Sequence, residues 1–272
     1  MTLYPVKPST SLGRSPDCGR LTIEANSALF LIEIAFMCGR VFVKSTFAEL
    51  MASFASVKRG DNLAGLDTGP RYNGAPSLTY PIIVRDADAS SGAFTEARWG
   101  LIPSWVKEAK PKVMPANARC ESIKRNGMFR GAYRSRRCLI PVDGYFEWRA
   151  NKGAKIKQPY ALAMADGRPF CLAGIWESRA DPDSRPGTEP KTFAIVTCTP
   201  NDLVATIHDR MPVILHPKDY ARWIGEDPDP ADLLAPFPSE LMKIWPVSMR
   251  VNNVRNQDVN LLETVEPEEP GL

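Results

Sequence analysis

The stretch Cys138-Leu-Ile-Pro-Val-Asp-Gly-Tyr-Phe-Glu-Trp148 gives the clearest indication of the fold class. It contains two short apolar runs separated by Asp143-Gly144, a dipeptide that favours turns. Runs of this length are typical of buried β-strands, so the stretch predicts two strands joined by a turn. Similar runs predict further strands over residues 40–44, 80–84, 160–164, 170–176, 193–198 and 243–247.

Turn and helix signals complete the expected architecture. Asp166-Gly167-Arg168-Pro169 separates two of the predicted strands and predicts a hairpin. Thr46-Phe-Ala-Glu49 has the pattern of a capping box and predicts a short helix after it, while Asn201 is expected to cap another that ends near His208. Because strands dominate and do not alternate regularly with helices, we expect one α+β domain with antiparallel or mixed sheets over residues 38–255.

The two ends of the chain are expected to lie outside this domain. The apolar run Ser27–Met37 is too short to span a bilayer and is interrupted by Glu33. We interpret residues 1–36 as an upstream over-extension of the reading frame, with translation starting at Met37, or as a leader that is cut off; a secretory signal fits less well. Residues 256–272 are acidic and predict a flexible tail, and the charged, proline-rich loop 179–191 predicts disorder.

Composition excludes several classes of protein. The 272 residues carry a formal charge of +3, which does not by itself indicate a nucleic-acid-binding protein. The six cysteines form no C-x-x-C pair, and the two histidines are not clustered, so neither a metal site nor another cofactor is predicted. Reduced thiols favour a cytoplasmic protein without membrane attachment, and we expect a monomer.

Residues 124–137 hold six Lys or Arg and no acid, which is typical of a solvated face or of a phosphate-binding surface.

Seven short segments, taken in order, resemble one known family. They are Met37-Cys-Gly-Arg40, Arg71-Tyr-Asn-Gly-Ala-Pro76, Arg98-Trp-Gly-Leu-Ile-Pro-Ser-Trp105, Asn117-Ala-Arg119 with Glu121, Arg137-Cys-Leu-Ile-Pro-Val-Asp-Gly-Tyr-Phe-Glu-Trp148, Ala173-Gly-Ile-Trp-Glu177 and Ile207-His-Asp-Arg-Met-Pro212. This set resembles the SRAP family (SOS response-associated peptidase), whose members crosslink to abasic sites in single-stranded DNA. The resemblance covers nearly everything from Met37 to about Asn253. Gly74 departs from it, because a bulkier apolar residue is usual there.

The resemblance implies a reaction at an N-terminal cysteine. Members of the family lose the initiator methionine, and the exposed cysteine forms a thiazolidine with the ring-opened sugar aldehyde of the abasic site. By this resemblance Cys38 is the nucleophile, Asn117 and Glu147 orient the reactants and shuttle protons, and His208 is an acid and base near the sugar. The resemblance also implies lyase-like chemistry on the imine and self-cleavage before the cysteine.

Further residues match positions that bind DNA. Arg40, Asn73, Arg119 and Arg210 match positions that line the site or hold backbone phosphates. Among the tryptophans that are candidates to stack on bases, Trp148 is the first choice. The implied partner is single-stranded DNA that contains abasic sites, bound in the cytoplasm through its backbone, because an abasic site has no base to read.

The chemistry of a terminal cysteine agrees with these roles. An α-amine has a pKa of about 7.7–8.0, so part of it is unprotonated at neutral pH, and it forms a Schiff base more readily than lysine does. A carboxylate and an imidazole beside the aldehyde supply the proton transfers that imine formation requires. Two alternatives remain open at this stage: a thiol hydrolase that uses Cys38 with His208 as base, and a non-covalent single-stranded nucleic-acid binding module.

Overall fold

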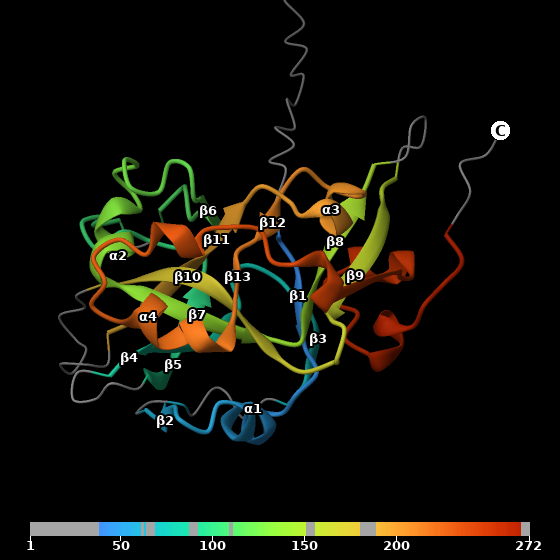
Figure 1. The fold of residues 1–272 in the computed structure, drawn as a ribbon, viewed down its shortest axis with the longest axis horizontal. Coiled ribbons are helices and arrows are strands. Elements are labelled where there is room, and N and C mark those ends of the chain that lie inside the picture. Colours follow the sequence, from blue (N-terminus) through green and yellow to red (C-terminus); the bar gives the residue numbers. More distant parts are fainter. Residues whose placement is uncertain are drawn as a thin grey trace, which may run out of the picture. The chain divides into compact units, whose positions relative to one another are not determined.

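The computed structural model describes residues 38–60, 63, 69–86, 92–108, 111–150, 156–179 and 189–267. The expected leader, Met37, and residues 180–188 of the expected disordered loop lie outside the described residues. Figure 1 shows the strands and short helices of the chain from Cys38 onward.

One of the two described sheets has five strands, all paired antiparallel, in the order β14-β9-β8-β1-β3. These strands are β1 (Val41–Val43), β3 (Arg71–Gly74), β8 (Gly144–Arg149), β9 (Gln158–Met164) and β14 (Met242–Pro246). Strand β8 is central and buried over most of its length, because Gly144, Tyr145, Phe146 and Glu147 are all covered. The sheet therefore brings the beginning of the domain, next to β1, beside the predicted site residue Glu147.

The other described sheet has nine strands and closes on itself. They are β2 (Lys58–Arg59), β4 (Thr79–Arg85), β5 (Gly92–Trp99), β6 (Asn117–Arg119), β7 (Arg137–Val142), β10 (Phe170–Ser178), β11 (Lys191–Cys198), β12 (Met211–Pro212) and β13 (Ile214–Leu215). Strands β11, β10, β7, β4 and β5 pair in sequence, and β5 pairs back with β11, so these five form a ring. The pairings of β11 with β5 and β6, and of β2 with β5, are parallel, which confirms the expected mixed α+β architecture.

Helices are short. They are α1 (Phe47–Ser53), α2 (Arg130–Ser135), α3 (Asp202–Ala205) and α4 (Tyr220–Ile224), with 3-10 turns η1 (Pro217–Asp219), η2 (Ala231–Leu233), η3 (Ser239–Leu241), η4 (Met249–Asn252) and η5 (Val259–Leu262). Thr46 and Glu49 form the predicted capping box at α1, and the Asn201 side chain accepts from the Val204 N–H at α3. Within the described residues no helix has the length and apolar character that crossing a bilayer requires.

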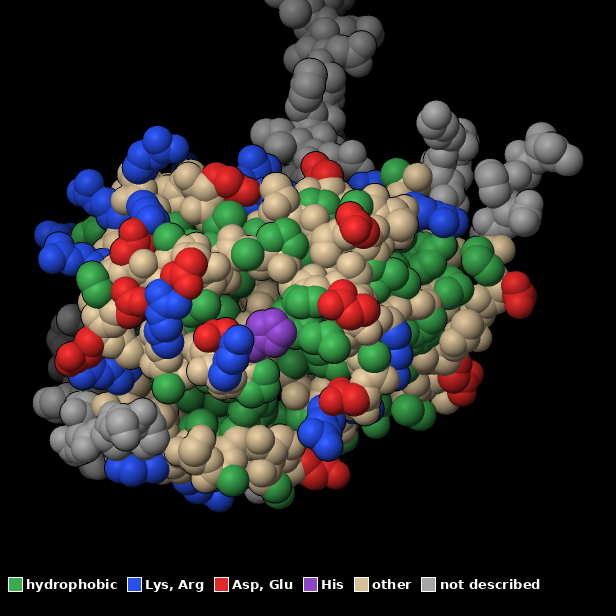
Figure 2. Space-filling view, in the orientation of Figure 1, with side chains coloured by type: hydrophobic (Ala, Val, Ile, Leu, Met, Phe, Trp, Pro, Cys, Tyr) green, Lys and Arg blue, Asp and Glu red, His purple; other side chains and the backbone are tan. Residues whose placement is uncertain are grey.

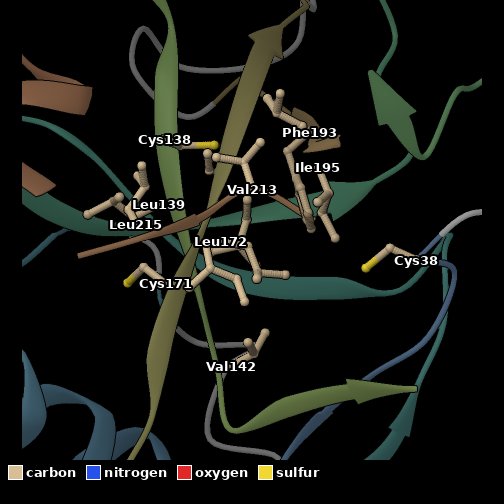
Figure 3. Packing of buried hydrophobic residues seen from close by; sticks show 14 of the residues in the cluster. Cys38, Cys138, Leu139, Val142, Cys171, Leu172, Phe193, Ile195, Val213 and Leu215 are labelled. Carbon is tan, nitrogen blue, oxygen red and sulfur yellow. The ribbon is translucent and has the colours of Figure 1, made fainter. Parts of the chain in front are cut away.

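Aromatic side chains pack where the ring of strands encloses the core. Trp99 on β5 stacks on Phe193 of β11 with ring centroids 6.1 Å apart, and Tyr80 of β4 meets both rings edge-on. Offset and edge-on contacts of this kind add to the free energy of burial. Figure 3 shows part of the same cluster, with Cys38 at its margin and its sulfur directed toward the packed side chains.

The predicted hairpin of residues 160–164 and 170–176 is wrong. The turn at Gly167 exists, with a φ of 74° that favours glycine, but β9 and β10 do not pair. Strand β9 pairs with β8 and β14, whereas β10 pairs with β7, β11 and β13. A turn signal shows that the chain reverses, but buried partners elsewhere decide which strands hydrogen-bond, and here the chain passes from one sheet to the other.

The expected flexible tail begins later than residue 256. Leu261 in η5 is fully buried, and the Trp245 indole N–H donates to the Leu262 carbonyl at 2.8 Å. Val247 and Thr264 form an isolated bridge. Apolar burial of the Leu261-Leu262 pair therefore outweighs the acidic composition and fixes the chain at least as far as Thr264, while residues 268–272 lie outside the described residues.

Candidate active site

Cys38 is the first described residue and lies just before β1. It is 1% exposed, and its φ of 42° places it in the left-handed region, which non-glycine residues rarely adopt. Its backbone N–H donates to Oε2 of Glu147 at 3.1 Å. Burial, and then the charge of Glu147, raise the pKa of the Cys38 thiol well above its usual range. The nitrogen, not the sulfur, is therefore the atom that the acid contacts.

Glu147 is an almost fully buried carboxyl on the central strand β8. Burial raises its pKa to about 7, although the N–H groups of Cys38 and Trp148 partly oppose this by donating to the carboxylate. A carboxyl with this pKa is divided between its protonated and ionised forms near neutral pH. It can therefore both take and return a proton, which is the property that general acid–base catalysis requires.

His208 completes the contact from the other side of the carboxyl. Its Nε2 lies 3.6 Å from Oε1 of Glu147, while its Nδ1 accepts from the Arg210 N–H at 3.1 Å. Asp209 also approaches Nδ1, at 3.2 Å, but its side chain is 89% exposed and its charge is screened by solvent, so the backbone donor defines the tautomer. Burial lowers the pKa of His208. The neutral imidazole thus carries its proton on Nε2 and directs it toward Glu147.

The site lies where the two sheets meet. Cys38 and Glu147 come from the edge of β1 and from β8 in the five-stranded sheet, whereas His208 follows α3 and precedes β12 in the nine-stranded sheet. The structure thus brings three of the four predicted catalytic residues into contact. Asn117 begins β6 beside Ile195 of β11 and is half-buried, and its catalytic role stays a prediction.

Arg40 and Asn73, which were predicted to line the site or hold phosphates, hold the chain together. Arg40 donates to Oδ1 of Asn73 at 2.6 Å and to the Val251 carbonyl at 2.7 Å. Asn73 has no exposed surface, and its amide donates to the carbonyls of Val251 and Asn253. Both side chains therefore fasten η4 to β1 and β3.

Arg210 and Arg119 have different surroundings. Arg210 forms a bidentate ion pair with Glu121, whose pKa it lowers to about 2, and it also donates to the Thr197 carbonyl at 2.9 Å. Arg119, at the end of β6, is exposed. Of the two, Arg119 presents its guanidinium to solvent, whereas Arg210 fixes the segment after His208 against β11.

The tryptophans also separate by environment. Trp99 is fully buried and donates to the Ala116 carbonyl, so it is a core residue whose ring has no surface to offer a base. Trp148 is half-buried: its indole N–H donates to Oδ1 of Asn252 at 2.7 Å, and the Arg40 guanidinium lies 5.5 Å from its ring centre. Trp105 is 65% exposed. Trp105 and Trp148 are thus the better placed of these three to meet a base.

The basic run 124–137 divides into two groups. Arg137 is buried and donates to the carbonyls of Trp223 and Gly225 at the end of α4, and Arg136 pairs with Glu177 at 2.8 Å. The exposed members are Lys124, Arg125, Arg130 and Arg134. Figure 2 shows Lys and Arg side chains gathered over the end of the domain that carries α2. The first group stabilises the fold, and the second forms a basic surface.

Sequence reasoning did not single out Tyr145. It lies two residues before Glu147 on β8, is fully buried, and its pKa is raised first by burial and then by the charges of Cys38, Glu147 and Cys198. Alternate residues of a strand share a face, so its spacing from Glu147 was the available signal. Among the described residues, no three His, Cys, Asp or Glu side chains are grouped as a metal site requires.

Comparisons with known proteins agree with this geometry. The family model for SOS response associated peptidase (SRAP) matches residues 37–254. The abasic site processing protein YoqW of Bacillus subtilis is 34% identical over 232 residues, 84% of this chain and 100% of that protein. The abasic site processing protein YedK of Escherichia coli is 31% identical over 234 residues, with the same coverage. A crystal structure of a Bacteroides thetaiotaomicron protein matches with a TM-score of 0.74 and 26% identity over 84% of this chain and 100% of that one. The chain belongs to the SOS response associated peptidase (SRAP) family.

Proposed function

We propose that this protein processes abasic sites in single-stranded DNA by forming a thiazolidine crosslink through Cys38 once that residue is the first of the chain. The contact that supports this most directly is the 3.1 Å distance between the Cys38 nitrogen and Oε2 of Glu147. After release of Met37 the same nitrogen is an α-amine, and the carboxylate is placed to take its proton. The relatives named abasic site processing proteins support the choice of substrate.

The reaction divides into steps that these residues can carry. Glu147 takes a proton from the ammonium, and the free amine adds to the aldehyde carbon of the ring-opened sugar. The resulting hydroxyl leaves as water with a proton returned by Glu147, whose pKa of about 7 suits both transfers. The Nε2–H of His208 is placed to donate a hydrogen bond to the carboxyl or to the departing oxygen. The sulfur then adds to the imine carbon and closes the ring; lyase-like strand cleavage would start from the same imine.

Self-cleavage before Cys38 belongs to the same proposal. The Cys38 thiol gives its proton to Glu147 and attacks the Met37 carbonyl carbon, the peptide nitrogen leaves with that proton returned by Glu147, and water then hydrolyses the thioester and restores the thiol. The left-handed φ of Cys38 supports this step. This conformation destabilises an L-residue by roughly 1–2 kcal/mol, and breaking the Met37–Cys38 peptide bond removes the constraint on φ. Residues 1–36 are then absent from the active, monomeric form.

The first test compares two forms of the chain on single-stranded DNA with one abasic site. A chain expressed from Met37, whose methionine is removed, should give a shifted band that survives heat and denaturant. No such band should form with a Cys38→Ala variant. None should form either with the full-length Glu147→Gln chain, in which the substitution blocks self-cleavage and the upstream residues stay attached. Equal crosslinking by a chain shown by intact mass to keep its upstream residues would rule out the amine mechanism.

The thiol hydrolase alternative is less favoured by the site. A hydrolase that acts on a separate amide substrate needs an accessible thiol paired with its base, but Cys38 is 1% exposed and the Glu147 carboxyl contacts its nitrogen. Acetylation of the α-amine discriminates the two: it should abolish crosslinking, whereas a thiol hydrolase would keep its activity. A purely non-covalent binding module would give no denaturant-resistant band with the wild type.

A further inference from the structure

Tyr145 is a buried tyrosine whose hydroxyl makes no hydrogen bond to any described residue. Most buried hydroxyl groups in proteins have a partner, because leaving one without costs free energy. Phenylalanine would fill the same volume without this cost. The hydroxyl is therefore more easily understood as a group that bonds during the reaction.

The fold places Tyr145 near the cysteine. Tyr145 and Glu147 lie on the same face of β8, while Phe146 between them packs in a separate cluster on the opposite face. Tyr145 belongs to the same core cluster as Cys38, and it pairs with Val41, three residues after that cysteine. Tyr145 is thus on the side of the sheet where Cys38 and the Glu147 carboxylate meet.

Electrostatics agrees with this placement. Burial is the largest cause that raises the pKa of the Tyr145 phenol, and negative charge on Cys38, Glu147 or Cys198 would raise it further, so the three groups are near enough to act on the phenol. Glu147 in turn faces His208, and it interacts with the charges of Lys157 and Asp209. A neutral phenol in this position is a donor that can face a developing negative charge on sulfur without adding charge to the site.

We infer that the Tyr145 hydroxyl positions the Cys38 sulfur and donates a hydrogen bond to it while the thiazolidine ring closes. This inference rests on the proposed function. In the ring-closing step the thiol proton passes to Glu147, and a sulfur electron pair forms the bond to the imine carbon. The electron pair of the C=N double bond moves to the protonated nitrogen, which becomes a neutral secondary amine. Tyr145 keeps its own proton throughout and acts only through the sulfur.

The test measures what fraction of the imine closes to the thiazolidine and what fraction is trapped by reduction. The chain expressed from Met37 is mixed with abasic single-stranded DNA in the presence of cyanoborohydride. Imine that is reduced gives an amine adduct two hydrogen atoms heavier than the thiazolidine, so mass spectrometry counts both products. In Tyr145→Phe we expect the ratio of thiazolidine to reduced amine to fall about tenfold, the effect of one hydrogen bond to a charged atom. The total rate of adduct formation should stay within about twofold of the wild type, because the amine step is untouched.

The pH dependence separates positioning from a structural defect. The deficit of Tyr145→Phe should shrink at high pH, where the thiol ionises without help. Tyr220→Phe is the matched control: its hydroxyl accepts from the Cys171 N–H, away from the site, and its product ratio should equal that of the wild type. A Tyr145→Phe ratio equal to the wild type, or an equal fall in both products at every pH, would overturn the inference.

Failure of the proposed function and misfolding of the variant can each be told apart from failure of the inference. If the wild type forms neither adduct, the proposed function fails, and the inference fails with it. If Tyr145→Phe does not fold, 3-fluorotyrosine incorporated at position 145 replaces it, because fluorine makes the phenol a stronger donor in the same shape. The thiazolidine ratio should then rise above that of the wild type, and an unchanged ratio would count against Tyr145.

Discussion

The backbone nitrogen of Cys38 and Oε2 of Glu147 lie 3.1 Å apart although 109 positions separate the two residues in the chain. Strands β1 and β8 pair directly, and this pairing carries the cysteine to the buried acid. The carboxyl accepts from an amide in the intact chain and would accept from an ammonium in the cut chain. In the proposed mechanism one contact therefore serves both the release of the amine and its later reaction.

The rate of crosslinking should depend on the ionisation of Glu147. Its pKa of about 7 means that the carboxylate needed to deprotonate the amine is lost as the pH falls below that value. We expect the wild-type rate to show an inflection near pH 7 in addition to that of the α-amine near 8. Glu147→Gln should lose the inflection near 7 and be slower by roughly 10²–10⁴-fold. Initial rates measured across this range check both statements; an inflection that survives in the glutamine variant would contradict them.

The same substitution should stabilise the fold at alkaline pH. The Glu147 pKa rises from an ordinary value of 4.5 to about 7 on folding, so the folded state holds the proton more tightly. Stability from this group is present below pH 4.5 and is lost as the pH rises through 7, by about 3 kcal/mol at about 1.4 kcal/mol per pH unit. Glu147→Gln should therefore gain stability relative to the wild type at pH 8 and little at pH 4, as measured by urea unfolding.

The two histidines should differ in their effect on activity. His208→Gln removes the Nε2–H that faces Glu147 and should slow crosslinking by on the order of tenfold to a hundredfold. His216→Gln is the control, because the ring of His216 packs 4.6 Å from that of Phe237 and away from Glu147. Gel-based rates decide the matter, and an equal loss in both variants would show that the effect comes from packing.

Substitution of Arg119 should affect mainly DNA affinity, whereas substitution of Arg210 should affect mainly the stability of the fold. Arg119→Ala removes an exposed charge, so it should weaken binding to single-stranded DNA and reduce its salt dependence with no loss of thermal stability. Arg210→Ala leaves Glu121 and the Thr197 carbonyl without their donor and should lower the free energy of unfolding by roughly 1–3 kcal/mol, mostly from the carbonyl because Glu121 is half exposed. Fluorescence anisotropy at several salt concentrations, with thermal melts, measures both. The reverse assignment would refute this reading of the two arginines.

Asn73 should act on the fold before it acts on DNA. Its fully buried amide joins Val251 and Asn253 and accepts from Arg40, so Asn73→Ala leaves several groups unpaired. A loss of about 2–4 kcal/mol is expected, together with release of η4, whose Asn252 holds Trp148. Hydrogen exchange of residues 249–253 should increase. An Asn73→Ala protein with wild-type stability and weaker DNA binding would support a direct contact instead.

The local elements were largely predictable from the sequence, but their partners were not. The capping box at Thr46 and the cap at Asn201 depend on neighbouring residues only, and both were confirmed. Strand β5 escaped notice because polar residues such as Glu96 alternate with small ones and weaken the apolar pattern. The hairpin at Gly167 failed because pairing is decided by distant strands, which no local signal encodes.

The candidate site was predictable in part for the same reason. Cys38, Glu147 and His208 were chosen from motifs, and the structure brings them together. Arg210 was expected at the DNA, but the spacing of a motif does not reveal that a nearby acid occupies its guanidinium. Tyr145 was missed because a tyrosine in an apolar strand has the appearance of an ordinary core residue; its spacing from Glu147 is a weak signal, and the unpaired hydroxyl is visible only in the structure.

The division of the reactive residues between two sheets has a consequence for the nascent protein. A terminal cysteine condenses with many small aldehydes, so an unfolded copy risks being consumed by metabolites before it meets DNA. Glu147 and His208 approach each other only when β8 and the segment before β12 have docked. In the proposed mechanism the amine gains its catalysts only once folding is complete, so condensation with these aldehydes is not accelerated in immature chains.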